Sequence, residues 1–207
     1  MATDGLFVSF EGIDGSGKST QARLSSEALR ASGREVVLTR EPGGSAGAEE
    51  VRRLLLTGDP DRWSPMTELL LFTAARRDHL ERTIRPALGR GAVVVSDRFA
   101  DSTRVYQGLG RGVGREAVDR IHALAIGQEP DLTLVIDMDP ARALARGLAR
   151  RSGEDRFEEM GLRLQEEARA GFRALAQEWP ERVRVVDGDR DAQAVASDVL
   201  ALVQARL

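Results

Sequence analysis

The most constraining feature of this sequence is a glycine-rich turn between a short apolar run and a segment with helical spacing. Residues 12–19 read GIDGSGKS, and they follow the apolar run LFVSF at 6–10. The pattern G-x-x-x-x-G-K-[ST], between a strand and a helix, is typical of a P-loop that surrounds phosphates with backbone N–H groups. Lys18 is the single lysine among 30 lysine and arginine residues. We infer that this position needs the compact ammonium group of lysine, for which the larger, planar guanidinium of arginine is a poor substitute.

The P-loop pattern predicts a role for each part of this turn. Glycines let the backbone direct its N–H groups inward, and the following helix adds the positive end of its dipole. Lys18 is expected to reach the β- and γ-phosphates, and Ser19 to bind Mg²⁺. The alternative is an ordinary glycine-rich turn. The predicted nucleotide-binding set is Gly12, Ile13, Asp14, Gly15, Ser16, Gly17, Lys18, Ser19 and Thr20.

Apolar runs that suit buried strands recur along the chain and alternate with segments of helical spacing. The runs lie at 6–10, 36–38, 92–96, 132–136 and 183–186. Helical spacing occurs, for example, at 22–29, 69–80, 118–126 and 195–207. This alternation predicts an α/β, three-layer P-loop NTPase fold, in which a parallel five-stranded sheet carries helices on both faces. No linker or repeat divides residues 1–207, so we expect a single domain with its ligands beyond the carboxyl ends of the strands.

Composition excludes several classes of partner. The formal net charge of -3 gives no basic field, so neither a nucleic acid polymer nor an anionic membrane is an expected partner. The sequence has no cysteine, which excludes a disulfide framework and thiol catalysis and fits a reducing compartment. No run approaches the ~18 apolar residues of a membrane span. We therefore expect a soluble, cytoplasmic protein.

A P-loop identifies the phosphate donor and leaves the reaction open. A GTPase would need a guanine-reading Asn-Lys-x-Asp, and the only lysine is already in the P-loop. A motor would usually need a much longer chain. The pattern therefore favours a small ATP-dependent kinase, with a nucleotide-binding switch protein as the alternative from another class.

The third apolar run continues into the polar segment SDRFADSTRVYQG. Asp97, at a strand end, is placed to help hold Mg²⁺, and Arg98 to bridge donor and acceptor phosphates. The alternative is a surface ion pair that caps a loop. Ser102, Tyr106 and Gln107 supply a hydroxyl, a ring and an amide at helical spacing, which suits a nucleoside acceptor.

With these residues in view, the chain resembles the bacterial thymidylate kinase family along essentially its whole length. The motifs that carry the resemblance are GIDGSGKST, TREPGGS (39–45), LLLFTAARRDH (69–79), SDRFADSTRVYQG (96–108) and ARGLARRSGEDRFE (145–158). The resemblance implies Mg²⁺-dependent phosphorylation of dTMP to dTDP by ATP, which supplies the dTTP precursor for DNA synthesis, and a homodimer. A kinase for another pyrimidine nucleotide or a deoxynucleoside is the alternative.

The resemblance also implies which residues hold the acceptor nucleoside. Phe72 is similar to the ring that stacks on thymine, and Arg76 to the donor to the pyrimidine O4. A spacing of four places both on one face of a helix. The alternative is a core phenylalanine with a solvated arginine. Gln107, beside Thr103, resembles the residue that bonds the base edge, and Tyr106 the residue that packs under the deoxyribose.

Further residues resemble the family's groups around the acceptor phosphate and sugar. Arg40 and Arg52 resemble groups that hold the 5′-phosphate, with Glu41 orienting Arg40 or a bound water. Asp14 resembles the acid that contacts the 3′-hydroxyl and organises the metal site; a solvent-facing loop aspartate is the alternative.

A closing arginine comes either from the P-loop or from a lid in this family. The P-loop position is Gly15, so a short mobile lid at about 146–158 is expected to supply it. The candidates are Arg150, Arg151 and Arg156. Arg146 resembles the residue that stacks on adenine. The alternative for this segment is a solvated helical face.

Two weaker features complete the prediction. Asp187 and Gly188 follow the last apolar run, where they could reach the adenine edge or form a turn that caps the final helix. His79 and His122 have no metal-ligand spacing and are expected to be structural.

Overall fold

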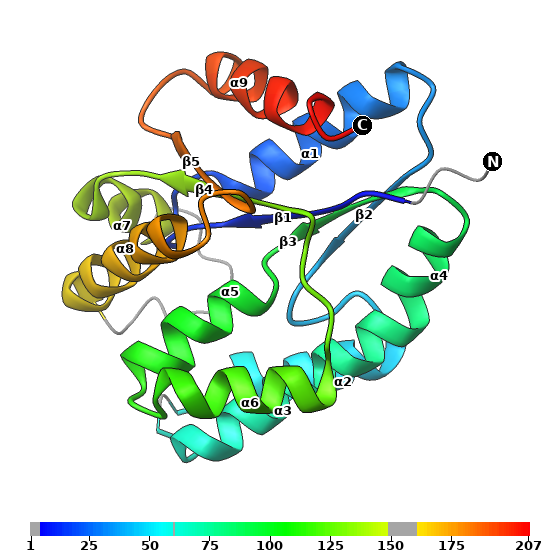
Figure 1. Ribbon diagram of the computed structural model, residues 1–207. Helices are drawn as coiled ribbons and strands as arrows, with labels where there is room; N and C mark the ends of the chain where they lie inside the picture. The colour runs from blue at the N-terminus through cyan, green and yellow to red at the C-terminus, as the bar shows by residue number, and fades with distance from the viewer. Residues whose placement is uncertain (1–4, 60, 149–160) are drawn as a thin grey trace.

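The computed structural model describes residues 5–59, 61–148 and 161–207. A parallel sheet forms the centre of the molecule, with five strands in the order β2-β3-β1-β4-β5 (Figure 1). The strands are β1 Phe7–Glu11, β2 Val36–Arg40, β3 Val93–Asp97, β4 Leu132–Asp137 and β5 Val183–Asp187. The predicted α/β fold with a five-stranded parallel sheet is confirmed, and each strand lies within one or two residues of its predicted run.

Helices connect the strands and cover the sheet. They are α1 Lys18–Ala31, α2 Ala46–Leu56, α3 Pro65–His79, α4 Arg85–Gly89, α5 Ala100–Thr103, α6 Arg115–Ala125, α7 Pro140–Leu148, α8 Gly161–Glu178 and α9 Ala192–Gln204. Two π-helical segments, η1 Leu80–Ile84 and η2 Arg104–Gly110, continue α3 and α5. Within the described residues, no helix combines the length and the apolar character that crossing a membrane requires.

The three central strands, β1, β3 and β4, bury both of their faces, because helices lie above and below the sheet (Figure 1). Val8 and Phe10 of β1 join a core cluster with Leu29 of α1 and Val199 of α9. Phe7, which directly precedes Val8 in sequence, belongs to a separate cluster on the other face of the sheet. Successive side chains of a strand point to opposite faces, so one short apolar run supplies two cores.

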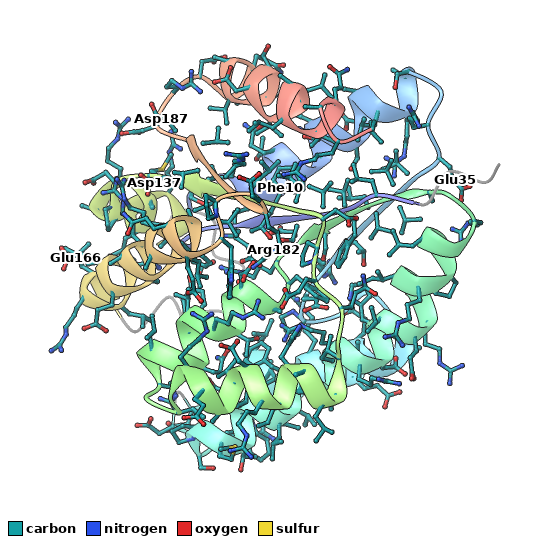
Figure 2. All side chains as sticks on the ribbon, in the orientation of Figure 1. Phe10, Glu35, Asp137, Glu166, Arg182 and Asp187 are labelled. Atoms are coloured by element: carbon teal, nitrogen blue, oxygen red, sulfur yellow. The ribbon has the colours of Figure 1, made fainter. Side chains whose placement is uncertain are left out.

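The sheet also sets where the polar segments meet. Parallel pairing aligns Phe10 of β1 with Asp97 of β3, and Arg40 of β2 with the same Asp97. Figure 2 shows Asp137 and Asp187, the last residues of β4 and β5, at one edge of the sheet, and Glu35, which precedes β2, at the opposite side. The carboxyl ends of all five strands therefore share one edge.

A core cluster beside the P-loop joins α8 to the segment after β3. Phe172 of α8 is 1% exposed and packs edge-on against Tyr106 of η2, with ring centroids 6.1 Å apart. Ile13 of the P-loop and Val135 of β4 belong to the same cluster. Packing at Phe172 therefore supports both the P-loop and η2.

We expect Phe172→Ala to lower the free energy of unfolding by about 3–5 kcal/mol, because it removes a buried ring and leaves a cavity. Denaturant titration measures this change. Gln177→Ala, on the exposed side of the same helix, is the control and should change stability by less than ~0.5 kcal/mol. Equal stability of the two variants would contradict the assigned role of Phe172.

Candidate active site

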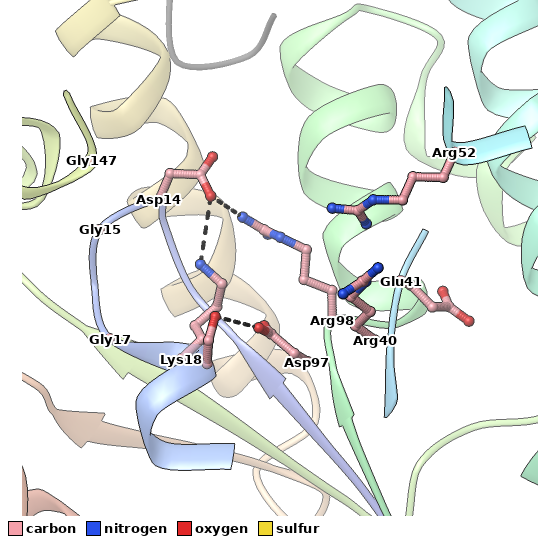
Figure 3. A pocket seen from close by; sticks show the side chains of 11 residues that line it. Asp14, Gly15, Gly17, Lys18, Arg40, Glu41, Arg52, Asp97, Arg98 and Gly147 are labelled. Carbon is pink, nitrogen blue, oxygen red and sulfur yellow. Dashed lines mark hydrogen bonds and ion pairs between the residues drawn. The ribbon is translucent and has the colours of Figure 1, made fainter. Parts of the chain in front are cut away.

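A pocket of ≈ 150 Å³ opens at the carboxyl ends of β1, β2 and β3 (Figure 3). Its charged lining comes from three segments that are far apart in sequence, namely the P-loop, the region around the end of β2 with α2, and the end of β3. The charged residues are Asp14, Lys18, Arg40, Glu41, Arg52, Asp97 and Arg98. The fold thus brings together residues that the sequence assigned separately to donor, acceptor and metal.

The P-loop has the backbone geometry that only glycine adopts readily. Gly12 and Gly15 have φ values of 133° and 84°. A Cβ atom at Gly12 would lie 2.5 Å from the Ile136 carbonyl oxygen, and one at Gly15 would lie 1.9 Å from the Ala143 carbonyl oxygen. Both positions therefore exclude a side chain, by conformation and by close contact with β4 and α7.

Lys18 is buried in this loop. Its Nζ donates to the Ile13 carbonyl at 2.8 Å and lies 3.7 Å from an Asp14 carboxylate oxygen. Burial and the nearby positive charge of Arg98 lower the pKa of Lys18 to about 8, although Asp14, Asp97 and Glu11 oppose this shift. Burial also opposes ionisation of Asp14, but Arg98 and Lys18 outweigh it and hold its pKa below the usual value.

Ser19 and Asp97 fit the predicted magnesium site. Ser19 Oγ donates to Asp97 Oδ2 at 2.5 Å, which joins the P-loop to β3. Asp97 Oδ1 is buried and has no hydrogen-bond partner within the described residues. Among the residues that the structure describes, no group of three or more histidine, cysteine, aspartate or glutamate side chains could hold a metal ion. A hydroxyl, one carboxylate and bound phosphates form the oxygen set that Mg²⁺ prefers, and waters complete it.

Arg98 spans the space between the P-loop and the segment after β3. Its Nη2 donates to Asp14 Oδ1 at 2.5 Å, and its Nη1 donates to Ser102 Oγ at 2.8 Å. The guanidinium carbon lies 5.2 Å from the centroid of the Tyr106 ring. Burial lowers the pKa of Arg98, but Asp14 and other acidic neighbours outweigh burial and raise the pKa above its ordinary value. The guanidinium therefore stays cationic.

The two arginines predicted to hold the acceptor phosphate line the pocket opposite the P-loop. Arg40 Nη2 lies 3.3 Å from both Glu49 carboxylate oxygens. Arg52 Nη1 donates to the Pro42 carbonyl at 2.5 Å. Figure 3 shows the Arg52 side chain reaching toward Arg98. The guanidinium groups of these residues therefore converge on one space.

Glu41 has different partners from those predicted. Its carboxylate accepts from Arg76 Nε at 2.7 Å and lies 3.0 Å from His79 Nδ1, whereas Arg40 pairs with Glu49. The expectation that Glu41 orients Arg40 is therefore wrong, because α3 presents a closer cation, while its alternative, that Glu41 orients a bound water, stays a prediction. Burial opposes ionisation of Glu41, but Arg76 and His79 lower its pKa, so the buried carboxylate stays charged.

The predicted base-binding residues gather between α3, α5 and η2. Arg76 is 4% exposed, which excludes the alternative of a solvated arginine, and its Nη2 donates to Thr103 Oγ1 and the Phe99 carbonyl. Phe72 lies one turn earlier on α3 and is partly buried. Gln107 Nε2 donates to Glu68 Oε1 at 2.9 Å.

Two predicted residues in the described part of the chain, Arg146 and Asp187, do not line this pocket. Arg146, on α7, is exposed, and its Nη1 lies 3.4 Å from the Met138 sulfur. Arg150, Arg151 and Arg156 lie outside the described residues. Asp187 accepts the Asp189 N–H at 3.0 Å in the turn after β5.

The two histidines contact carboxylates. His79 bridges Glu41 and Thr39 Oγ1, and His122 Nε2 lies 3.1 Å from Glu129. Neither one belongs to a metal-binding cluster among the described residues.

Two buried acids near the site are missing from the sequence prediction. Glu68, on α3, is fully buried and accepts from Gln107. Glu11, the last residue of β1, is also fully buried, and burial together with the charge of Asp101 raises its pKa to about 7, although Arg98 opposes the shift. The signal for Glu11 is an acidic residue at the end of an apolar run, directly before Gly12.

Nucleotide binding is expected to increase the protonated fraction of Lys18. Phosphate charge raises the pKa of an ammonium, so a lysine half-ionised at pH 8 should take up about 0.5 proton per ATP bound at that pH. The uptake should fall toward zero at pH 6, where Lys18 is already protonated. Calorimetric titration in buffers of different ionisation enthalpy measures it.

The control for this measurement is Lys18→Arg, because a guanidinium keeps its charge at both pH values. Its proton uptake at pH 8 should be lower than that of the unaltered protein. Identical uptake by the two proteins would show that another group titrates.

Comparison with known proteins identifies the family. The family model described as thymidylate kinase matches residues 10–199. The thymidylate kinase of Ruegeria pomeroyi is 64% identical over 207 residues, covering 100% of this chain and 98% of the relative. That of Dinoroseobacter shibae is 66% identical over 201 residues, covering 97% of each chain. A crystal structure of thymidylate kinase from Ehrlichia chaffeensis covers 96% of this chain and 98% of its own, with a TM-score of 0.78 and 35% identity. The chain therefore belongs to the thymidylate kinase family.

Proposed function

We propose that this chain transfers the γ-phosphoryl group of ATP to the 5′-phosphate of dTMP and releases dTDP and ADP. The observation that carries the proposal is the pocket in which a P-loop and the arginine pair Arg40 and Arg52 line one space, with Arg98 alongside. Two phosphate chains need positive groups from several directions, because the transition state spreads charge over the transferred group. The family relationship supports dTMP as the acceptor.

On the donor side, the P-loop would bind the phosphates of ATP. Its backbone N–H groups and Lys18 would surround the β- and γ-phosphates, and Arg146 would lie against the adenine. The lysine now bonds the Ile13 carbonyl, so phosphate oxygens would replace that acceptor. Ser19 and Asp97 would hold Mg²⁺, which when bound neutralises phosphate charge.

On the acceptor side, Arg40 and Arg52 would hold the 5′-phosphate, and the base would lie toward α3. Phe72 would stack on thymine, while Glu41 and Thr103 fix the guanidinium of Arg76. The Nη1 of Arg76 makes no hydrogen bond within the described part of the chain, which supports its use as a donor to a pyrimidine carbonyl.

Three further side chains would complete the acceptor site. Gln107 and Ser102 would bond the nucleoside, and the buried ring of Tyr106 would pack under the deoxyribose and leave little space for a 2′-hydroxyl. Asp14 would contact the 3′-hydroxyl. Its carboxylate already accepts a hydrogen bond from Arg98, so the same carboxylate would contact both the sugar and the bridging arginine.

A lid would then complete the positive charge around the transferred group and exclude water. The P-loop cannot supply an arginine at position 15, since a side chain there would collide with the Ala143 carbonyl oxygen. This supports the lid segment at about 146–158 as the source. Arg150, Arg151 and Arg156 are the proposed residues.

The resemblance further implies a homodimer in the cytoplasm, and we include both in the proposal. Leu70 of α3 and Leu124 of α6 are 52% and 89% exposed. These apolar side chains belong to helices that lie against each other, so a partner chain could cover both.

A panel of acceptors tests the proposed reaction. With ATP and Mg²⁺, dTMP should give the highest kcat/KM, and UMP should be lower by at least about 100-fold, because it carries a 2′-hydroxyl and also lacks the 5-methyl group. The value for dUMP, which lacks the methyl group, should fall by about 10-fold. Thymidine should fall by at least ~10⁴-fold, because it leaves the phosphate-binding arginines unpaired. Coupled measurement of ADP release gives these values.

Lys18→Ala is the control for this panel and should remain folded without dTMP-dependent turnover. Equal turnover of UMP and dTMP, or preferred turnover of thymidine, would assign the chain to another nucleotide or deoxynucleoside acceptor. Tight ATP binding without acceptor-dependent ADP release would indicate a switch protein.

Single alanine variants of Arg150, Arg151 and Arg156 test the lid. At least one should lower kcat by about 10³-fold, as expected for an arginine that stabilises the transition state, and change the KM for dTMP little. Arg163→Ala is the control, because this exposed arginine of α8 pairs only with Glu167 within the described residues. Unchanged kcat in all three lid variants would place the role elsewhere.

A further inference from the structure

Glu11 is a fully buried acid that none of the roles above uses. It ends β1, and the pairing of Phe10 with Asp97 places it beside the first residues after β3. Its Oε1 accepts the Phe99 backbone N–H at 2.7 Å, and its Oε2 accepts the Ser102 hydroxyl at 2.6 Å. A buried carboxylate is costly unless such donors satisfy it, so both contacts are needed for its burial.

The backbone directly before Phe99 is strained. Arg98 has a φ of 74°, and no other non-glycine residue in the described part of the chain has a positive value. Such a conformation is unfavourable for a side-chain-bearing residue and persists only where its surroundings fix it. Here the Arg98 N–H donates to the Phe10 carbonyl, Ser96 Oγ donates to the Arg98 carbonyl, and Glu11 fixes the next N–H at Phe99.

The same carboxylate reaches the end of the Arg98 side chain through one hydroxyl. Ser102 Oγ donates to Glu11 and accepts from Arg98 Nη1 at 2.8 Å. A hydroxyl can do both at once, since it carries one donor and two acceptor sites. Glu11 thus contacts both the turn that aims Arg98 and, through Ser102, the guanidinium itself.

We propose that Glu11 is a positioning residue for phosphoryl transfer, which holds the turn at Arg98 and, through Ser102, the guanidinium between the two phosphate chains. This inference rests on the proposed function of the same pocket. It predicts that Glu11 acts on turnover only through Arg98. A purely structural acid would affect the protein whether or not Arg98 is present.

A double-mutant cycle separates these roles. Glu11→Gln is isosteric, but it replaces one of the two carboxylate oxygens, which accept from Phe99 and Ser102, with an NH₂ group that can only donate. We expect it to lower kcat by about 10- to 100-fold, as misplaced catalytic groups do, with KM values for dTMP and ATP within ~3-fold. In the Arg98→Ala background, the same change should lower kcat by less than ~2-fold.

The matched control is Asp131→Asn, since Asp131 also accepts a backbone N–H of the β1 region, from Phe7, at the opposite end of the strand. Its factor in kcat should be the same with and without Arg98. Equal factors for Glu11→Gln in the two backgrounds, or no effect of it in the unaltered protein, would overturn the proposal.

Two further measurements keep the test decisive. If Glu11→Gln does not fold, Ser102→Ala takes its place, because it breaks the link to the guanidinium. It should lower kcat in the unaltered background and by less than ~2-fold in the Arg98→Ala background, whereas loss of a nucleoside contact alone would lower kcat equally in both. Amide hydrogen exchange at Phe99 should become at least ~10-fold faster in Glu11→Leu, which offers no side-chain acceptor to the Phe99 N–H, and unchanged exchange would contradict the contact. An unaltered protein without dTMP-dependent ADP release would contradict the proposed function, whereas additive kcat losses in an active enzyme contradict the role of Glu11 alone.

Discussion

The arrangement of the pocket depends on the parallel pairing of β1 with β3. This pairing sets Phe10 opposite Asp97, so the P-loop and the segment that begins at Asp97 leave the sheet side by side. The pairing of β2 with β3 adds Arg40 to the same edge. Parallel strands place all their carboxyl ends together, so residues more than 80 positions apart in sequence line one small space. A shift of one residue in register would also turn the apolar side chains of β1 to the wrong faces.

The acidic side chains around the pocket are paired with cationic ones. Glu41 pairs with Arg76 and contacts His79, and Asp14 pairs with Arg98 and Lys18. Arg40, which pairs with Glu49, and Arg52 line the same pocket as the P-loop. The acids near the site thus hold cations in place. The guanidinium groups of Arg40 and Arg52 face the space where polyanions would bind.

The sequence predicted the strands and the P-loop well and the contacts of the acids poorly. Strand bounds followed from apolar runs, because burial on both faces leaves a continuous signal. Glu41 was expected to orient Arg40, yet it bonds Arg76, a residue 35 positions away. Glu11 and Glu68 were missing from the prediction because their partners, Ser102 of α5 and Gln107 of η2, are far away in sequence, and no local pattern links such residues.

By itself, the sequence determined the five strands, the glycine-rich turn around its only lysine and the family to which the chain is similar. Each of these features follows from residues that are close together in sequence, because their spacing fixes backbone conformation and burial. The tertiary structure alone decided which acid meets which cation, and that the turn at Arg98 adopts a positive φ beneath Glu11. Those features depend on distances between strands and helices that sequence spacing does not contain, because the pairing of the whole sheet sets them.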